Sequence, residues 1–284
     1  MAVPRLATWG NEHGGAAITA LFEGSVVALG AFACDPADPL WRLENCIGDG
    51  PHVVFPSTAV RLTLDGQHPS IANANHVVVY RDRRRFRREL CDRRGDRSLF
   101  AVVDPGVWAE MLGAAAQPEG VGRLDAAAFV TLRSLAAAPP ADALETEERL
   151  LALVRLSLGA TPRAPRPAGQ HRLVESAKEL LAARFAQPLS LAQIAREVHA
   201  SPFHLARTFR RHTGYSLHEY RTQLRLRSVA SRLAERDRRL VELALDAGFA
   251  SHSHLTDAFR RSFGMPPSVL RMRTITEAGP PLRA

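Results

Sequence analysis

Two similar stretches of fifteen residues occur in the last third of the chain. They read ASPFHLARTFRRHTG at 200–214 and ASHSHLTDAFRRSFG at 250–264. In both copies a serine precedes a run with apolar residues at helical spacing, and a glycine follows that run. The sequence therefore predicts two similar helices, each with a serine N-cap. Two copies are too few for a solenoid, which needs at least about three stacked units.

A shorter helical pattern precedes each copy. The first has Ser190 as an N-cap candidate, and the second ends in Gly248, which can adopt the positive φ of a tight turn. Two short helices joined by a tight turn form a helix-turn-helix, whose second helix enters the major groove of DNA. The apolar faces of the preceding helices are Leu191, Ile194, Ala195 and Val198 in the first copy, and Leu240, Leu243, Ala244 and Ala247 in the second.

The second helix of each pair is predicted to have one apolar and one DNA-facing side. Leu205 and Phe209 face the first helix of their pair, as do Leu255 and Phe259 in the other copy. Arg207 is interpreted as a base reader, with a solvated arginine as the alternative, and the arginines at the helix ends as phosphate contacts. The residues predicted to face DNA are Ser201, Phe203, Ala206, Arg207, Arg210, Arg211, His252, Ser253, Thr256, Asp257, Arg260 and Arg261.

Between the copies, residues 216–237 have apolar residues near helical spacing and no proline. They predict a long, rigid connecting helix. Two recognition helices at a fixed separation would enter successive major-groove turns on one face of DNA, roughly 34 Å apart. The repeat is explained if one chain reads two groove segments.

Basic residues concentrate in the same region. Residues 168–273 contain 18 Lys and Arg against 9 Asp and Glu, whereas the remaining residues contain 19 against 20. This surplus favours a polyanionic partner, because phosphate contacts release condensed counterions whatever the base sequence.

Two longer stretches within residues 171–273 are LAQIAREVHASPFHLARTFRRHTGYSLHEYRTQLRLR and ALDAGFASHSHLTDAFRRSFGMPPSVLR. In order and spacing they resemble the AraC/XylS-type transcription regulators. The resemblance implies sequence-specific binding of double-stranded DNA, with RNA polymerase as a further partner. The family often has an arginine where Asp257 stands. An aspartate cannot donate to guanine but can accept from cytosine N4, so the base contact of the second copy is left open.

A proline-rich stretch, ATPRAPRPAG at 160–169, marks a domain boundary, because its prolines interrupt any continuous helix. We predict an N-terminal domain over 1–159, a linker over 160–169, a DNA-binding domain over 170–273 and a flexible tail over 274–284. The expected fold class is α+β, with an N-terminal cupin-like β-barrel and helices, followed by an all-α domain with two helix-turn-helix motifs.

Residues 16–104 contain short β-rich runs, such as HVVFP and HVVVY, separated by turn residues. They predict an all-β barrel or jelly roll, with helices following from Gly106 to about Leu158. The resemblance implies that the barrel is cupin-like and binds a small-molecule effector or forms a homodimer. The apolar stripe of residues 144–158 fits either packing on the barrel or contact with a second subunit. The charged run at 81–97 is interpreted as a solvated face, with an anion site as the alternative.

The sequence does not contain the residue patterns expected for two kinds of enzyme. His52, His68 and His76 are isolated, which argues against the His-x-His pattern of a metallo-oxygenase, and we expect no metal and no cofactor. A cysteine-dependent DNA-alkylation repair protein is the alternative enzyme, but it would need an activated thiolate in a Pro-Cys-His-Arg-like setting. No such setting surrounds Cys34, Cys46 or Cys91.

A nonspecific architectural protein is the remaining alternative, and it would show a steep salt dependence with little sequence preference. No apolar run approaches the ~18 residues that span a bilayer, and the start lacks the apolar region, roughly 7 to 15 residues long, of a secretory signal. We therefore expect a cytoplasmic, non-enzymatic transcription regulator with no membrane partner.

Overall fold

The computed structural model describes residues 17–112, 118–137, 139–159, 168–233 and 238–276. The chain divides into two compact units between Ala164 and Pro165. Residues 160–167 of the predicted linker and 277–284 of the predicted tail lie outside the described residues. Within the described ranges, no helix is both long and apolar enough to cross a membrane.

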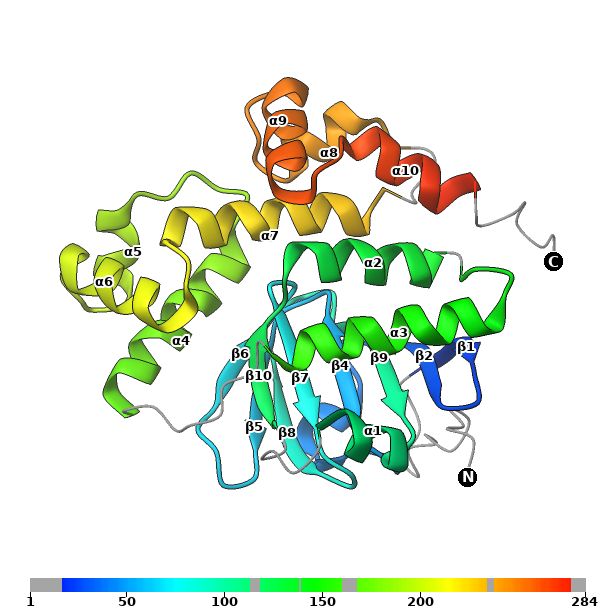
Figure 1. Ribbon diagram of the computed structural model, residues 1–284. Coiled ribbons are helices and arrows are strands. Elements are labelled where there is room, and N and C mark those ends of the chain that lie inside the picture. Colours follow the sequence, from blue (N-terminus) through cyan, green and yellow to red (C-terminus); the bar gives the residue numbers. More distant parts are fainter. Residues whose placement is uncertain (1–16, 113–117, 138, 160–167, 234–237, 277–284) are drawn as a thin grey trace. The chain divides into compact units, whose positions relative to one another are not determined.

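The N-terminal unit combines antiparallel sheets with helices (Figure 1). Its strands are β1 (Ala17–Glu23), β2 (Val27–Cys34), β3 (Asn45–Cys46), β4 (His52–Pro56), β5 (Val60–Leu64), β6 (Ser70–Ala72), β7 (His76–Tyr80), β8 (Arg85–Leu90), β9 (Asp96–Val103) and β10 (Gly120–Arg123). Its helices are the 3-10 helix η2 (Pro39–Arg42), α1 (Pro105–Leu112), α2 (Ala126–Ala137) and α3 (Ala143–Leu158).

These strands form two sheets. One has the strand order β1-β2-β9-β4-β7-β10, and the other has the order β3-β8-β5-β6. The predicted cupin-like barrel is not confirmed, because the ladders of the described strands end at β1 and β10 and at β3 and β6 instead of closing into one ring. The fold class is therefore mixed, with a sheet-rich N-terminal region and a helical C-terminal domain.

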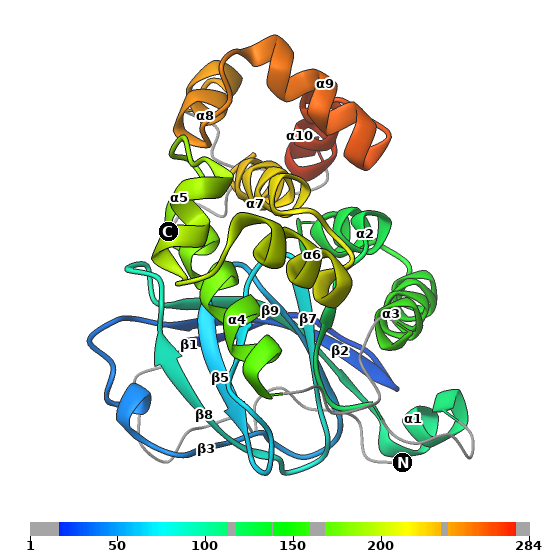
Figure 2. The same cartoon turned by 90° about the vertical axis from the view of Figure 1, so that its left-hand side faces the viewer.

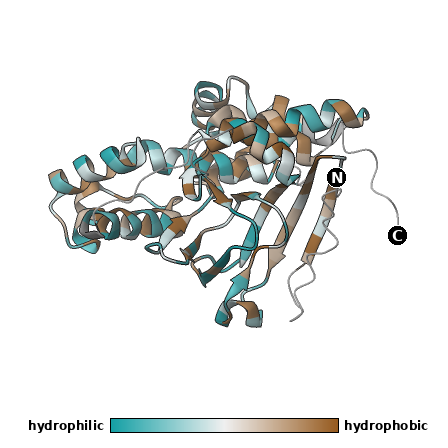
Figure 3. Ribbon diagram, turned by 60° about the horizontal axis from the view of Figure 1, so that its bottom comes forward, coloured by the Kyte–Doolittle hydropathy of each residue, from teal (hydrophilic) through white to brown (hydrophobic). Residues whose placement is uncertain are grey.

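The hydrophobic core of the N-terminal unit joins the two sheets. Val78 and Tyr80 of β7 share a buried cluster with Leu62 and Leu64 of β5. Arg61 and Thr63, which alternate with these leucines, are only partly buried, as the two-residue period of a strand requires. In Figure 3, strands of the six-stranded sheet are accordingly coloured largely as hydrophobic.

Helices α2 and α3 lie side by side, and α3 contacts β2 and β10 (Figures 1 and 2). The apolar stripe of α3 packs within its own unit through Leu150, Val154 and Leu158, which are buried. Leu144 and Leu156 remain 64% and 60% exposed.

Most charged side chains of the run at 81–97 are exposed, as predicted for a solvated face, but the run includes β8, in which Arg88 is an exception. Arg88 is buried in this strand, and its Nη1 donates to Asp96 Oδ2 at 2.8 Å. Its guanidinium lies 4.8 Å from the Phe32 ring and 5.2 Å from the Trp41 ring. An ion pair and two aromatic rings thus allow a charged side chain to be buried.

The C-terminal unit is helical. It contains α4 (Ala168–Arg184), α5 (Leu191–Glu197), α6 (Pro202–Thr213), α7 (Leu217–Ser231), α8 (Leu240–Asp246), α9 (His252–Phe263) and α10 (Pro267–Thr276). The predicted connecting helix is α7, which is shorter than the stretch 216–237, and residues 234–237 lie outside the described ranges.

The same packing occurs twice in this unit. Helix α6 contacts α4, α5 and α7, and α9 contacts α7, α8 and α10 (Figures 1 and 2). Helix α7 therefore takes part in both arrangements, after the first helix pair, α5–α6, and before the second helix pair, α8–α9. The cluster around the first pair comprises Val174, Ala177, Leu181, Ile194, Ala195, Leu205, Phe209, Leu217, Tyr220 and Leu224.

Candidate nucleic-acid interface

Side-chain caps mark the starts of both helices in the first pair. The Ser190 hydroxyl accepts from Gln193 N at 3.2 Å, and Gln193 Oε1 accepts from Ser190 N at 2.8 Å, which completes a capping box. Ser201 caps α6 by accepting from His204 N at 3.3 Å, with Pro202 in the first helical position. The predicted N-caps of this pair are confirmed.

The second helix pair repeats this design with one change. Ser251 caps α9, but Arg239 occupies the N-cap position of α8 and provides no side-chain cap. Glu242 instead accepts from Arg239 N at 3.2 Å and from Arg239 Nε at 2.8 Å. Helices α6 and α9 end at Gly214 and Gly264, with φ of 75° and 72°, as predicted.

The exposed side of α6 carries the residues predicted to face DNA. Leu205 and Phe209 are fully buried, whereas Phe203 is 76% exposed and Arg207 and Arg210 are also exposed. Phe203, Ala206, Arg207, Arg210 and Arg211 follow the spacing of one helical face, and only Ala206 among them is half-buried. The Ser201 hydroxyl is engaged in the cap.

Helix α9 presents a different set in the same positions. His252, Ser253, Asp257, Arg260 and Arg261 are exposed. Thr256 is half-buried, and its hydroxyl donates to His252 O at 2.9 Å. Each helix thus brings its own six predicted residues together, and Asp257 stands where α6 has Arg207.

An arginine–carboxylate pair recurs at the end of the first helix in each pair. Arg184, the last residue of α4, makes two contacts of 2.8 Å with Glu197 at the end of α5. Arg232, directly after α7, lies 3.3 Å from Asp246 at the end of α8. Such surface pairs contribute only about 0.2–1 kcal/mol each, but they connect equivalent helices in both copies.

A second recurring contact was not predicted from the sequence. Arg221 of α7 donates to Leu189 O at 3.1 Å, directly before the N-cap of α5. Arg271 of α10 donates to Arg238 O at 2.7 Å, directly before the N-cap of α8. The offset of 50 residues between the two arginines was the signal that could have revealed it.

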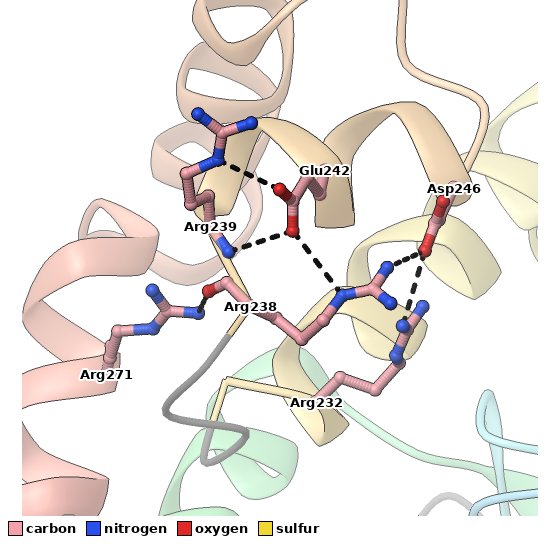
Figure 4. Close-up of polar contacts among 6 residues, drawn as sticks. All are labelled: Arg232, Arg238, Arg239, Glu242, Asp246 and Arg271. Carbon is pink, nitrogen blue, oxygen red and sulfur yellow. Dashed lines mark hydrogen bonds and ion pairs between the residues drawn. The ribbon is translucent and has the colours of Figure 1, made fainter.

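Figure 4 shows the larger network around α8. Asp246 contacts both Arg232 and Arg238, and Glu242 contacts Arg238 and Arg239. These ion pairs hold the start of α8, where a capping hydroxyl is replaced by Arg239.

The two helix pairs meet at one junction. Arg225 of α7 donates to Phe185 O at 2.6 Å, and its guanidinium lies 6.0 Å from the ring of Phe249, which follows the turn of the second pair. Gly248 in that turn has a φ of 83°, and a Cβ added there would lie 2.2 Å from Ala186 O. Burial, assisted by the charge of Arg221, lowers the pKa of Arg225 to about 10.

The equivalent position in the first turn is His199, which has a φ of 54°. The positive φ predicted for Gly248 is confirmed, and the first copy adopts a similar backbone conformation with a side chain present. The second copy has glycine because the backbone of Ala186 occupies the space that a Cβ would need.

Four exposed arginines of α6 and α9 are free to contact an external partner. Arg207, Arg210, Arg260 and Arg261 have no ion pair within the described residues, and all are exposed. Most arginines in the charged run of the N-terminal unit are instead paired with carboxylates, in Arg83–Asp49, Arg84–Glu119, Arg85–Glu44, Arg88–Asp96, Arg94–Asp92 and Arg97–Asp35. The unpaired arginines on α6 and α9 can therefore meet phosphates without first breaking an ion pair.

The three cysteines differ in their environments. Cys34 is buried, and desolvation raises the pKa of its thiol to about 11 although Arg88 opposes the shift. Cys46 is exposed and Cys91 is partly buried. In the part of the chain that the structure describes, no three His, Cys, Asp or Glu side chains form a group able to hold a metal ion.

The C-terminal unit is similar to known proteins. Residues 194–273 match the model of a helix-turn-helix domain. The multiple antibiotic resistance protein MarA of Escherichia coli K12 is 35% identical over 85 residues, which are 30% of this chain and 67% of MarA. The bifunctional transcriptional activator and DNA repair enzyme AdaA of Bacillus subtilis is 27% identical over 104 residues, 37% of this chain and 49% of AdaA.

A solved AraC-type transcriptional regulator from Chromobacterium violaceum is 28% identical, covers 38% of this chain and 97% of its own, and has a TM-score of 0.36. The MarA match, the helix-turn-helix model and the repeated motifs agree. This chain belongs to the AraC/XylS-type family of DNA-binding transcription regulators.

Proposed function

We propose that this regulator reads two successive major-groove segments of double-stranded DNA with one chain. The two reading helices are α6 and α9, and the proposal is supported mainly by the features that they share. Both helices start from a serine cap, bury a Leu/Phe pair and expose arginines at their ends. Recognition helices that belong to one rigid domain can enter groove segments roughly 34 Å apart.

The proposed contacts divide by chemistry. Arg207 contacts the acceptors of a guanine, and Phe203, an exposed aromatic one turn earlier, contacts a thymine methyl group. Arg210 and Arg211 of α6, with Arg260 and Arg261 of α9, bind phosphates and set the register. Ser201, Ala206, His252, Ser253 and Thr256 complete the DNA-facing surface.

The N-terminal unit is proposed to regulate this binding by accepting a small-molecule effector or by forming a homodimer. An effector acts only if it binds one arrangement of the protein better than another. The exposed Leu144 and Leu156 of α3 support a contact with a second copy. Sedimentation of the full chain tests the proposed dimer. Self-association that is weakened by Leu144→Ser supports it. RNA polymerase is the further proposed partner.

Selection of binding sites from random duplex DNA, at one near-physiological salt concentration, tests the two-segment proposal. The expected result is a motif of two elements whose centres are about one helical turn apart. A single element would refute the second reading helix. Binding without any motif and with a steep salt dependence would instead indicate an architectural protein.

Methyl transfer in DNA repair is not favoured by this geometry, although AdaA is named as a repair enzyme. A methyl acceptor needs an accessible thiolate, and Cys34 does not meet this need because it is buried and its thiol has a raised pKa. Methyl transfer from damaged DNA to Cys46 or Cys91, detected by mass spectrometry, would support the repair function.

A further inference from the structure

We propose that the two reading helices contribute unequally, and that Asp257 makes α9 a discriminator that selects cytosine in the second element. This inference rests on the proposed two-segment function. It concerns what α9 recognises, whereas the proposed function concerns only that α9 enters the groove.

The first observation is the charge on equivalent positions. Helix α6 carries Arg207 and no acidic residue, whereas α9 carries Asp257 fifty residues later. Both side chains are exposed and lie one turn after the other exposed residue of the pair, Phe203 or Ser253. A position that adds attraction to a polyanion in one helix adds repulsion in the other.

The second observation is that the Asp257 carboxylate is not engaged within the protein. Among the residues that the structure describes, no ion pair or hydrogen bond involves it, although Arg260 and Arg261 follow it by one turn. An ion pair would have masked its charge. The carboxylate therefore keeps its full capacity to accept hydrogen bonds and to repel phosphate and base acceptors.

The third observation concerns the space around this short side chain. One turn earlier α9 has Ser253, where α6 has the large and exposed Phe203. Thr256, beside it, is half-buried, and its hydroxyl is bonded to His252 O. On the side of Asp257 toward the start of α9, Ser253 and Thr256 are small enough to permit a close approach of the helix to the base edges. An aspartate requires this approach because its side chain is short.

Base chemistry then decides the preference. In the major groove cytosine presents the N4 amino donor, which a carboxylate accepts, whereas guanine presents the acceptors N7 and O6 and repels it. Asp257 therefore lowers the affinity of α9 for most sequences and relieves that cost where a cytosine stands opposite. The first element supplies affinity, and the second supplies discrimination.

Site selection with the full-length Asp257→Asn variant tests the inference, with Glu110→Gln as the matched control. The control removes one negative charge from an exposed position of the N-terminal unit. Wild-type protein should prefer cytosine over guanine about tenfold at one position of the second element. Asp257→Asn should lose that preference and favour adenine there, since asparagine pairs with adenine N6 and N7.

On DNA that contains only the first element, Asp257→Asn should bind a few-fold more tightly than wild type, and Glu110→Gln should not. An Asp257→Asn variant with an unchanged second element would overturn the inference while leaving the two-segment function intact. A wild-type protein that selects no second element would overturn both.

Discussion

The junction between the helix pairs leads to a sharp prediction for Gly248→Ala. Gly248 has a φ of 83°, and an added Cβ would lie 2.2 Å from Ala186 O and 2.8 Å from Ala186 Cα. The left-handed backbone costs a residue with a Cβ about 1–2 kcal/mol. Backbone atoms cannot rotate away as a side chain does, so relieving the overlap adds about 1–3 kcal/mol. The expected destabilisation of the second pair is therefore about 2–5 kcal/mol.

Hydrogen exchange resolved to peptides is the suitable assay. Fluorescence would not detect the change, because all three tryptophans, Trp9, Trp41 and Trp108, precede the C-terminal unit. Exchange in α8 and α9 should accelerate at least about thirtyfold, the equivalent of roughly 2 kcal/mol. DNA with both elements should bind at least about tenfold more weakly, whereas DNA with the first element should bind nearly as before.

His199→Ala is the matched control for this prediction. His199 occupies the equivalent turn position with a φ of 54° and already carries a Cβ. Its replacement should leave exchange in α5 and α6 within about threefold of wild type. If Gly248→Ala behaved like His199→Ala, the close approach to Ala186 would not restrict the position of the second pair, and the reasoning would be refuted.

Three further predictions concern the remaining sites. Arg207→Ala should weaken binding to a selected site by about 1–3 kcal/mol and relax the preference at one base of the first element. Titration with DNA variants measures both effects, and an unchanged base preference would contradict the assignment. Arg88→Met should destabilise the N-terminal unit by about 3–5 kcal/mol, because Asp96 is then buried without its cation; urea unfolding followed by tryptophan fluorescence measures this, and Arg88→Met with Asp96→Leu should recover much of the loss. Burial lowers the pKa of His52 from 6.5 to about 3, so below pH 6.5 the unfolded chain binds a proton that the folded unit does not bind. The free energy of unfolding should therefore be about 2 kcal/mol lower at pH 5 than at neutral pH, and it should continue to fall until about pH 3. The same unfolding assay on His52→Gln should show a smaller loss over that range, and equal losses would contradict the assignment.

Local signals in the sequence were sufficient for most of the C-terminal unit. Ser190 and Ser201 are caps, Leu205 and Phe209 are buried, and Gly214 ends its helix, all as the pattern predicts. These features depend on residues within one or two turns of each other. The ties of Arg221 and Arg225 to carbonyl groups more than thirty residues away depend on packing, and helical periodicity alone does not indicate them.

The N-terminal unit was harder to predict because its decisive contacts are long-range. The runs HVVFP and HVVVY were identified as strands, and they are β4 and β7. Whether a sheet closes depends on the partners of its last strands, which no run reveals by itself. The strand β8 was missed because its arginines suggest a solvated face, and the burial of Arg88 depends on Asp96 of the next strand.

Helix α7 has a consequence for how such a protein can diversify. Its Tyr220 belongs to the core cluster of the first pair, while its Gln223 bonds to Ser262 of the second pair at 2.8 Å. A recombination junction within α7 would therefore take a packing partner from both helix pairs. Under the proposed function, point changes on the exposed faces of α6 and α9, such as at 203, 207, 253 and 257, alter the target preference without disturbing α7. Recombination between relatives should succeed only when it transfers α4 through α10 as one block.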